Sequence, residues 1–286
     1  MTETGKIPLK VGIGGLGTIG LPVARWLDGS AGGLDGTGHI EPEEGLALAA
    51  VSAGNSERAE ERVSAFNTPV PVVGLSELAG LCDIIVECAP PEEFQDIADP
   101  VVQAGKVLVP LSITSLLNRM DLIETARETG ARIIVPTGAL LGLDAVRAAA
   151  QGTVHSVTMV TRKPPQGLKK APFVIEQGLN LDDLSEAKML FQGPVAEAAA
   201  KFPTNVNVAV ALSLAGIGPD KTQYEVWADP GVNHNTHTIK VDADTVSFEM
   251  TIENVPTVEN PATGKLVPLS VIETLRGLVS SLKVGT

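Results

Sequence analysis

The chain has 286 residues, of which 44% are hydrophobic and only 3% aromatic, and its formal net charge is −13. This length is sufficient for two modest domains or one large one. A core built mainly from alanine, valine, leucine and isoleucine suits parallel α/β packing. The negative charge argues against a nucleic-acid partner, because phosphate binding needs a basic surface.

Two cysteines, Cys82 and Cys88, flank the apolar run 83–87. As the ends of a strand they would lie about 20 Å apart, so we expect two unpaired structural thiols and a reducing compartment. The N-terminal residues Met1–Lys6 lack an apolar signal region, and no run approaches the length of a membrane span. These features together predict a soluble cytoplasmic protein.

The first motif along the chain is Gly15-x-Gly17-x-x-Gly20, which directly follows the apolar run 9–13. In a strand–turn–helix, such glycines make the tight turn, let the backbone approach a pyrophosphate and allow close helix–strand packing. The first-turn N–H groups, including those of Thr18 and Ile19, and the helix dipole then hold the anion. The motif predicts a dinucleotide-binding unit; the alternative is a plain glycine-rich turn.

The first half of the chain alternates strands with helices, as in a doubly wound parallel sheet. A Gly- and acid-rich surface excursion is expected over 29–44. Gly105 and Gly130 are expected to end helices. The predicted strands are 11–13, 46–51, 83–87, 106–111 and 132–135, and the predicted helices are 18–28, 56–66, 76–79, 95–104 and 115–129.

The second half has a different pattern, in which apolar and polar residues alternate as in half-buried strands of a mixed or antiparallel sheet. We interpret it as a separate substrate domain, with a final apolar helix over 269–282 that returns to the first domain. The predicted boundaries are 1–137 plus 258–286 for the nucleotide-binding domain and 138–257 for the inserted domain. The strands expected there are 154–161, 224–227, 236–241 and 246–252, and the helices 184–200 and 207–214.

The end of the second strand bears on the choice between NAD and NADP. An acidic residue there would bind the ribose hydroxyls and favour NAD. This chain instead has Ser52 and Asn55, and Arg58 follows, which could meet a 2′-phosphate or could be a solvated helix residue. We therefore lean slightly to NADP, with dual use expected.

The chain has four histidines, His39, His155, His234 and His237. The first lies in the glycine-rich excursion and the second at a strand start, so solvated and structural roles are expected for them. The other two fall where a turn runs into a strand of the second domain, a common place for catalytic groups. A histidine pKa suits acid–base work near neutral pH, so one of these two is a catalytic candidate.

Two further segments contain polar groups with alternative roles. Asn205, at a predicted helix start, is either an N-cap or an amide that orients a ligand. Arg162 and Lys163 end a strand and form either a site for an acidic substrate or a solvated basic turn. The sequence shows no metal-ligand spacing, phosphate P-loop or serine nucleophile elbow.

Together these segments resemble the L-aspartate dehydrogenase family. The glycine fingerprint is common to many dehydrogenases, whereas the later motifs are more specific. The resemblance is carried, over nearly the whole chain, by residues 15–20, 137–145, 161–165, 203–209, 229–230 and 235–239.

The resemblance implies a Rossmann domain completed by the C-terminal helix, an inserted α/β domain, a homodimer and NAD or NADP as cofactor. It places the catalytic role on His237 of Asn235-x-His237-x-Ile239, and we add Lys163 as the residue for a substrate carboxylate. It also makes Ala139 and Asn207 cofactor contacts. The full predicted cofactor set is Gly15, Gly17, Thr18, Ile19, Gly20, Ser52, Asn55, Arg58, Ala89, Ala139 and Asn207.

The predicted reaction is oxidation of L-aspartate to iminoaspartate by hydride transfer to the nicotinamide. Water then gives oxaloacetate and ammonia reversibly, or the imine passes to NAD biosynthesis. One alternative is a related reductase of another small acid, of the homoserine or dihydrodipicolinate type. A different class of alternative is an NADP sensor without catalysis, which would not need an acid–base histidine.

Overall fold

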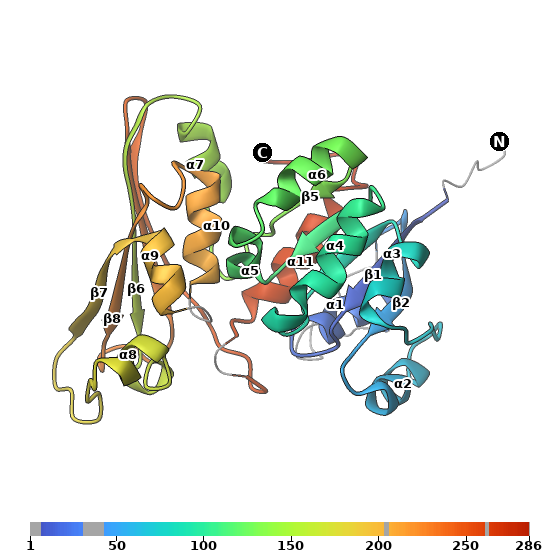
Figure 1. Cartoon of the computed structure of the whole chain (residues 1–286), viewed down its shortest axis with the longest axis horizontal. Coiled ribbons are helices and arrows are strands. Elements are labelled where there is room, and N and C mark those ends of the chain that lie inside the picture. The colour runs from blue at the N-terminus through green and yellow to red at the C-terminus, as the bar shows by residue number, and fades with distance from the viewer. Residues whose placement is uncertain (1–6, 31–42, 203–205, 261–262, 286) are drawn as a thin grey trace. The chain divides into compact units, whose positions relative to one another are not determined.

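The computed structural model describes residues 7–30, 43–202, 206–260 and 263–285. The chain divides into two compact units, Met1–Pro136 with Val267–Lys283 and Thr137–Leu266 with Val284–Thr286. Each unit is built around its own five-stranded sheet (Figure 1). Within the described residues, no helix has both the length and the apolar character needed to span a membrane.

The first unit is a parallel sheet in the order β2-β1-β3-β4-β5, which confirms the predicted doubly wound class. Its strands are β1 (Leu9–Gly14), β2 (Leu46–Ser52), β3 (Ile84–Glu87), β4 (Val107–Pro110) and β5 (Arg132–Ile133). Its helices are α1 (Gly20–Asp28), α2 (Ser56–Ser64), α3 (Leu78–Leu81), α4 (Phe94–Gln103), α5 (Ile113–Leu117), α6 (Asp121–Thr129) and α11 (Leu266–Arg276).

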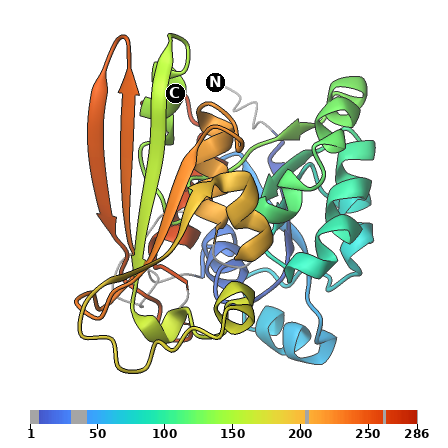
Figure 2. The same ribbon diagram turned by 60° about the vertical axis from the view of Figure 1, so that its left-hand side comes forward.

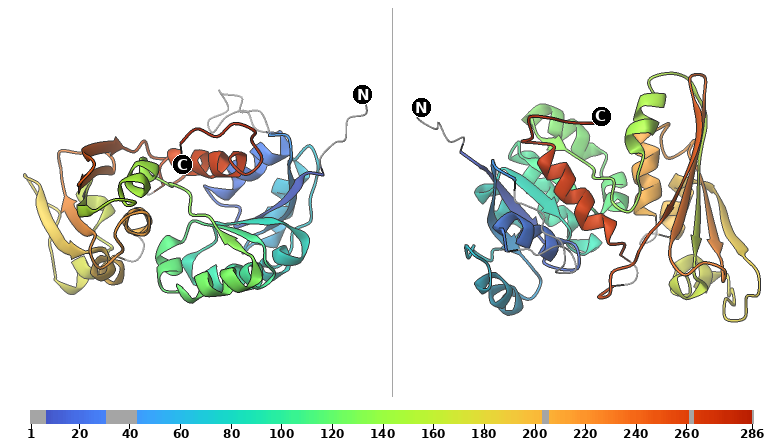
Figure 3. Two further views of the ribbon diagram at one scale, coloured as in Figure 1. Left: turned by 90° about the horizontal axis from the view of Figure 1, so that it is seen from above. Right: turned by 180° about the vertical axis from the view of Figure 1, so that it is seen from behind.

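Both faces of this sheet are covered, which explains the uninterrupted apolar run in β3. Ile84 and Val86 join a core cluster with α1, α2 and α11. Ile85 points to the opposite cluster, formed with α3, α4 and α6. Figure 3 shows these helices on the two sides of the sheet. Because alternate strand residues face opposite sides, a strand buried on both faces must be apolar throughout.

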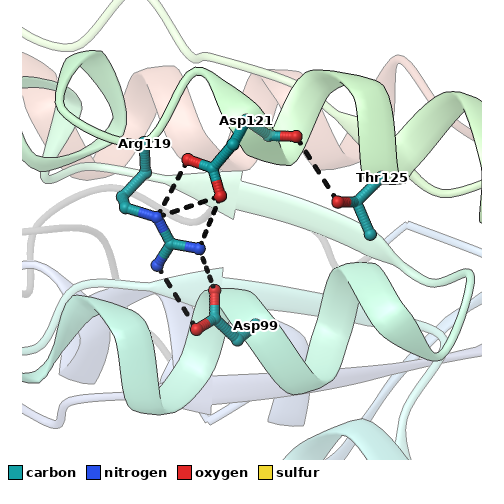
Figure 4. A network of polar contacts seen from close by, with 4 residues as sticks. All are labelled: Asp99, Arg119, Asp121 and Thr125. Atoms are coloured by element: carbon teal, nitrogen blue, oxygen red, sulfur yellow. Dashed lines mark hydrogen bonds and ion pairs between the residues drawn. The ribbon is translucent and has the colours of Figure 1, made fainter.

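The helix predicted over 115–129 is wrong in one respect, because it is two helices, α5 and α6. Arg119 lies in the joint between them and links α4 to α6 (Figure 4). Its guanidinium group donates to Asp121 at 2.8–3.2 Å and forms an ion pair with Asp99 at 3.0 Å. These bonds raise the pKa of Arg119 and lower that of Asp121. Gly130, at φ 78°, ends α6 as predicted.

The second unit contains a mixed sheet in the order β10-β9-β6-β8-β7, in which only the β6–β8 pair is parallel. Helices lie on one face of this sheet, as Figure 2 shows, and the strand residues facing them are buried. The strands are β6 (Val154–Lys163), β7 (Lys188–Pro194), β8 (Gln223–Ala228), β9 (Thr236–Ala243) and β10 (Ser247–Glu253). The helices are α7 (Leu143–Ala149), α8 (Pro172–Glu176), α9 (Val195–Lys201) and α10 (Asn207–Ala215).

The helix predicted over 184–200 is also wrong. Residues 188–194 form the edge strand β7, paired antiparallel with β8, and the helix begins only at Val195. Pro194 is the residue before α9 and has no backbone N–H to donate inside a helix. The proline therefore marks the boundary that the apolar pattern alone did not show.

Candidate active site

The glycine motif forms the turn between β1 and α1, and each of its glycines has a different surrounding. A Cβ on Gly15, whose φ is +105°, would lie 2.4 Å from the Cys88 carbonyl oxygen. A Cβ on Gly20 would lie 1.8 Å from the Gly15 oxygen. A Cβ on Gly17 would meet nothing within 4 Å, and this residue is exposed. Two glycines are thus needed for packing, and the third leaves open space beside the start of α1.

A cavity of about 370 Å³ opens at this turn. It brings together the predicted residues Gly15, Gly17, Asn55, Arg58 and Ala89. A neighbouring cavity of about 550 Å³ is lined by the predicted residue Ser52, which is itself buried. The predicted residues Thr18 and Ile19 form the half-buried turn that leads to Gly20, the first residue of α1.

The same cavity contains a cation that sequence reasoning missed. Arg62 lines it together with Arg58 and donates a hydrogen bond to the Leu16 carbonyl oxygen within the glycine loop. Burial, and then the positive charges of Arg58 and Arg25, lower the pKa of Arg62. Residues 58 and 62 are one helical turn apart, and this spacing in the sequence could have indicated that the two arginines lie side by side.

Asn55 has a structural task in addition to its place in the cavity. Its side-chain oxygen accepts from the Arg58 backbone N–H at 2.9 Å and so caps α2. An N-cap of this kind satisfies one of the free donors of the first helical turn. Only the amide nitrogen of Asn55 is then left over for a ligand.

Behind the loop, Glu87 ends β3 as a fully buried carboxylate that the sequence reasoning did not single out. It accepts from the Ser112 backbone N–H and hydroxyl, both at 2.9 Å, and from the Leu111 N–H at 3.1 Å. Burial raises the pKa of Glu87, and these hydrogen bonds oppose the rise. Glu87 therefore ties the end of β3, next to Cys88 and the glycine turn, to the end of β4.

In the second unit, Thr161, Lys163 and His237 share the inner, helix-covered face of the sheet. Thr161 of β6 lies directly opposite His237 of β9 in the antiparallel register. The Thr161 Oγ1 and His237 Nδ1 atoms are 2.9 Å apart. Lys163 lies two residues further along β6 and so on the same face. All three side chains are buried, with at most 7% exposure.

Burial determines the protonation states of His237 and Lys163. Burial, and secondarily the Lys163 cation, lower the pKa of His237 to about 3. Burial alone lowers the pKa of Lys163 to about 8. At neutral pH the site therefore holds a neutral imidazole beside an ammonium group.

Other candidates on these strands point elsewhere. Arg162 alternates to the opposite face, where it pairs with Asp229 at 2.9 Å and stacks on Trp227. The two cations of the predicted pair are therefore separated. His155 is exposed, and His234 is half-buried with its carbonyl oxygen facing the Thr236 hydroxyl.

The remaining predicted residues fall in the second unit or outside the described residues. The Ala139 carbonyl oxygen accepts from the Asn254 side-chain amide at 3.0 Å. Asn207 is the first residue of α10. His39 and Asn205 lie outside the described residues.

Comparison with known proteins gives a match for each half of the chain. A family model described as "Aspartate dehydrogenase, C-terminal" matches residues 144–278, the part that contains His237 and Lys163. A model described as "Homoserine dehydrogenase, NAD binding domain" matches residues 15–136, the part that contains the glycine loop. The second model supports a pyridine nucleotide as cofactor, and the open space at Gly17 fits one.

Similar proteins cover nearly the whole chain. An L-aspartate dehydrogenase of Bradyrhizobium diazoefficiens is 47% identical over 99% of this chain and 96% of its own. L-aspartate dehydrogenase 3 of Bordetella bronchiseptica is 47% identical over 97% and 98%. The crystal structure of aspartate dehydrogenase from Thermotoga maritima shares the fold, with a TM-score of 0.70 and 24% identity over 97% of this chain and 99% of that one. The full-length likeness to the first two, added to the shared motifs, shows that this chain belongs to the L-aspartate dehydrogenase family.

Proposed function

We propose that the protein catalyses the NAD(P)-dependent oxidation of L-aspartate. The C2 hydrogen leaves as hydride for the nicotinamide ring, which supplies the two-electron acceptor, and the nitrogen becomes an imine. Water adds to C2, the C–N bond breaks, and the products are oxaloacetate, ammonia, the reduced cofactor and a proton. The observation that carries this proposal is the buried pair of neutral His237 and cationic Lys163 in the unit that matches aspartate dehydrogenases.

His237 is the residue we assign to proton handling at C2. Its Nδ1 is engaged by Thr161, so Nε2 is the nitrogen left for substrate. It would take the proton lost by the adding water and return it in the reverse direction. Because the ring is neutral at pH 7, it does not repel the cationic imine that forms beside it.

Lys163 is the residue we assign to a substrate carboxylate. A dicarboxylate that approaches a chain of net charge −13 needs a local cation. A buried ammonium meets it more strongly than an exposed one, because the surroundings have a lower dielectric constant than water.

For the cofactor, we propose a preference for NADPH over NADH. No acidic residue ends β2, and Arg58 and Arg62 line the cavity beside its end. Two guanidinium groups suit a 2′-phosphate, which a ribose hydroxyl cannot replace as a partner. We also keep Ser52, Asn55, Ala89, Ala139 and Asn207 as proposed cofactor contacts.

We further propose a cytoplasmic homodimer. The two cysteines are free thiols, which suits a reducing compartment. Light scattering on the purified protein would give the mass of the assembly. The link to NAD biosynthesis stays a prediction.

The first test follows absorbance of the reduced nicotinamide with oxaloacetate, ammonium and either NADH or NADPH. Oxidation of the cofactor only when both substrates are present supports the proposal. His237→Ala should lower kcat by about 10²–10⁴, whereas the matched His234→Ala should stay close to wild type. No turnover despite cofactor binding would contradict the assignment and favour the sensor alternative.

A further inference from the structure

Arg62 makes a contact that Arg58 lacks, although both arginines line the cavity at the glycine turn. The Nη1 of Arg62 donates a hydrogen bond to the Leu16 carbonyl oxygen. Arg62 is half-buried, whereas Arg58 is exposed. Among the described residues, the hydrogen bond of Arg58 is a backbone contact with Asn55, which leaves its guanidinium group unpaired.

The Arg62 contact fixes the orientation of one peptide group in the glycine turn. The Leu16 carbonyl group and the Gly17 N–H group belong to the same planar trans peptide unit, so they point in opposite directions. When Arg62 holds the carbonyl oxygen, it therefore also sets the direction of the Gly17 N–H. No described residue accepts a hydrogen bond from this N–H, and Gly17 is exposed beside open space. The N–H group is thus available to a ligand.

The preceding part of the turn is held by the sheet instead. The Cys88 thiol donates to the Gly15 carbonyl oxygen at 3.2 Å, and the Gly15 N–H donates to the Ser52 carbonyl oxygen at 2.8 Å. Two successive carbonyl groups of the turn, those of Gly15 and Leu16, thus accept from side chains. The first donor follows β3, and the second, Arg62, lies on α2. Arg62 is therefore the residue through which α2 influences the shape of the turn.

The contact with Leu16 does not exhaust the donors of Arg62. A guanidinium group carries five N–H donors in a planar fork, and this contact uses one of them. The others can meet an anion in the cavity that Arg62 lines. Because one corner of the fork is already held, less side-chain freedom is lost when an anion binds. Arg58 offers a guanidinium group without this restraint, so removal of the two arginines should have different effects.

We propose that Arg62 is a positioning residue for the pyrophosphate that NADH and NADPH share, whereas Arg58 acts only on the 2′-phosphate that distinguishes NADPH. The proposal deepens the cofactor part of the proposed function and rests on it. Arg62 holds the Leu16 peptide group so that the Gly17 N–H donates to the pyrophosphate, and its remaining donors assist Arg58 at the 2′-phosphate. The same side chain thus links the binding of the two phosphate groups.

Fluorescence titration of the full-length protein with NADH and NADPH separates the two roles without any turnover. In Arg58→Met, we expect the Kd for NADPH to rise about tenfold or more and the Kd for NADH to stay within about twofold of the wild type. In Arg62→Met, the Kd for NADH should also rise, by about fivefold or more, because the released peptide group must be ordered when the pyrophosphate binds. Arg62→Lys keeps one donor for the Leu16 carbonyl oxygen and should restore NADH binding.

Arg25→Met is the matched control. Arg25 is exposed and its positive charge acts on Arg62, but it lines neither cavity. Its removal should change both Kd values by less than about twofold. Unchanged NADH affinity in Arg62→Met, an equal loss in Arg25→Met, or no recovery in Arg62→Lys would overturn the proposal. Absence of aspartate oxidation by the wild type would refute the proposed activity alone, because NADH titration of the Arg62 variants would still decide the role of this residue.

Discussion

Replacing Gly17 by alanine tests whether this glycine is needed for ligand binding, whereas other glycines of the motif are needed for packing. The added methyl group would meet no atom within 4 Å, and the backbone there is not in the left-handed region. A Gly→Ala change at such a position stabilises a protein by about 0.4–1 kcal/mol, because it restricts the unfolded chain. In Gly20→Ala the methyl group would lie 1.8 Å from the Gly15 carbonyl oxygen, so backbone must move. Overpacking of this kind costs about 3 kcal/mol or more.

Cofactor binding should respond in the opposite sense. The methyl group of Gly17→Ala fills the open space beside the first turn of α1, where the pyrophosphate would approach. We expect its dissociation constant for NADPH to rise at least tenfold, or about 1.4 kcal/mol. Urea unfolding and fluorescence titration measure the two effects separately. The matched control is Gly80→Ala, which also adds a methyl group in open space, but in α3. If Gly17→Ala binds NADPH as tightly as this control, the ligand interpretation of Gly17 is refuted.

Three further changes test the buried and bridging charges. Burial raises the pKa of Glu87 above 4.5, so the stability that its carboxyl group contributes should fall as the pH rises through that higher value. Urea unfolding from pH 4 to 8 should show that Glu87→Gln removes this fall. Glu87→Leu should cost about 2–4 kcal/mol, because the two Ser112 donors lose their acceptor. Lys163→Met should raise the free energy of unfolding at pH 7 by a gain on the order of 3 kcal/mol, and this gain should shrink between pH 8 and 10.5. The wild-type KM for oxaloacetate should rise above pH 8, because the ammonium group loses its proton. A KM that does not change with pH would argue against a carboxylate partner. Arg119→Met should lower the melting temperature through a loss of about 1 kcal/mol, and unchanged stability would show that the contacts in Figure 4 contribute nothing.

Elements with strong local signals were predictable from the sequence. The strand run 83–87 and the helix stops at Gly105 and Gly130 are cases in which a few neighbouring residues determine the conformation. The strand β7 was not, because Lys188–Pro194 carries a weak apolar pattern and becomes a strand only by pairing with β8. The break between α5 and α6 falls at Arg119, which contacts Asp99 on α4, 20 residues earlier in the chain, and a local pattern does not reveal such a contact.

The candidate site likewise combines residues that the sequence identifies with contacts that only the folded chain creates. The residue types in the glycine turn and in Asn235-x-His237-x-Ile239 point to chemistry by themselves. The burial of His237 and its contact with Thr161 depend on the register of two strands that lie 76 residues apart in the chain. A spacing rule cannot supply that register, which is set when the inner faces of β6 and β9 pack against helices.

The ammonium group of Lys163 and the neutral imidazole of His237 also couple substrate binding to proton transfer. Without substrate, burial, and secondarily the Lys163 ammonium group, keeps the imidazole neutral. A substrate carboxylate that pairs with Lys163 offsets the repulsion that lowers the pKa of His237, so the ring becomes a better proton acceptor only once the substrate is bound. On this argument the two residues act as a unit, and a substrate without the second carboxylate would lose both affinity and proton transfer.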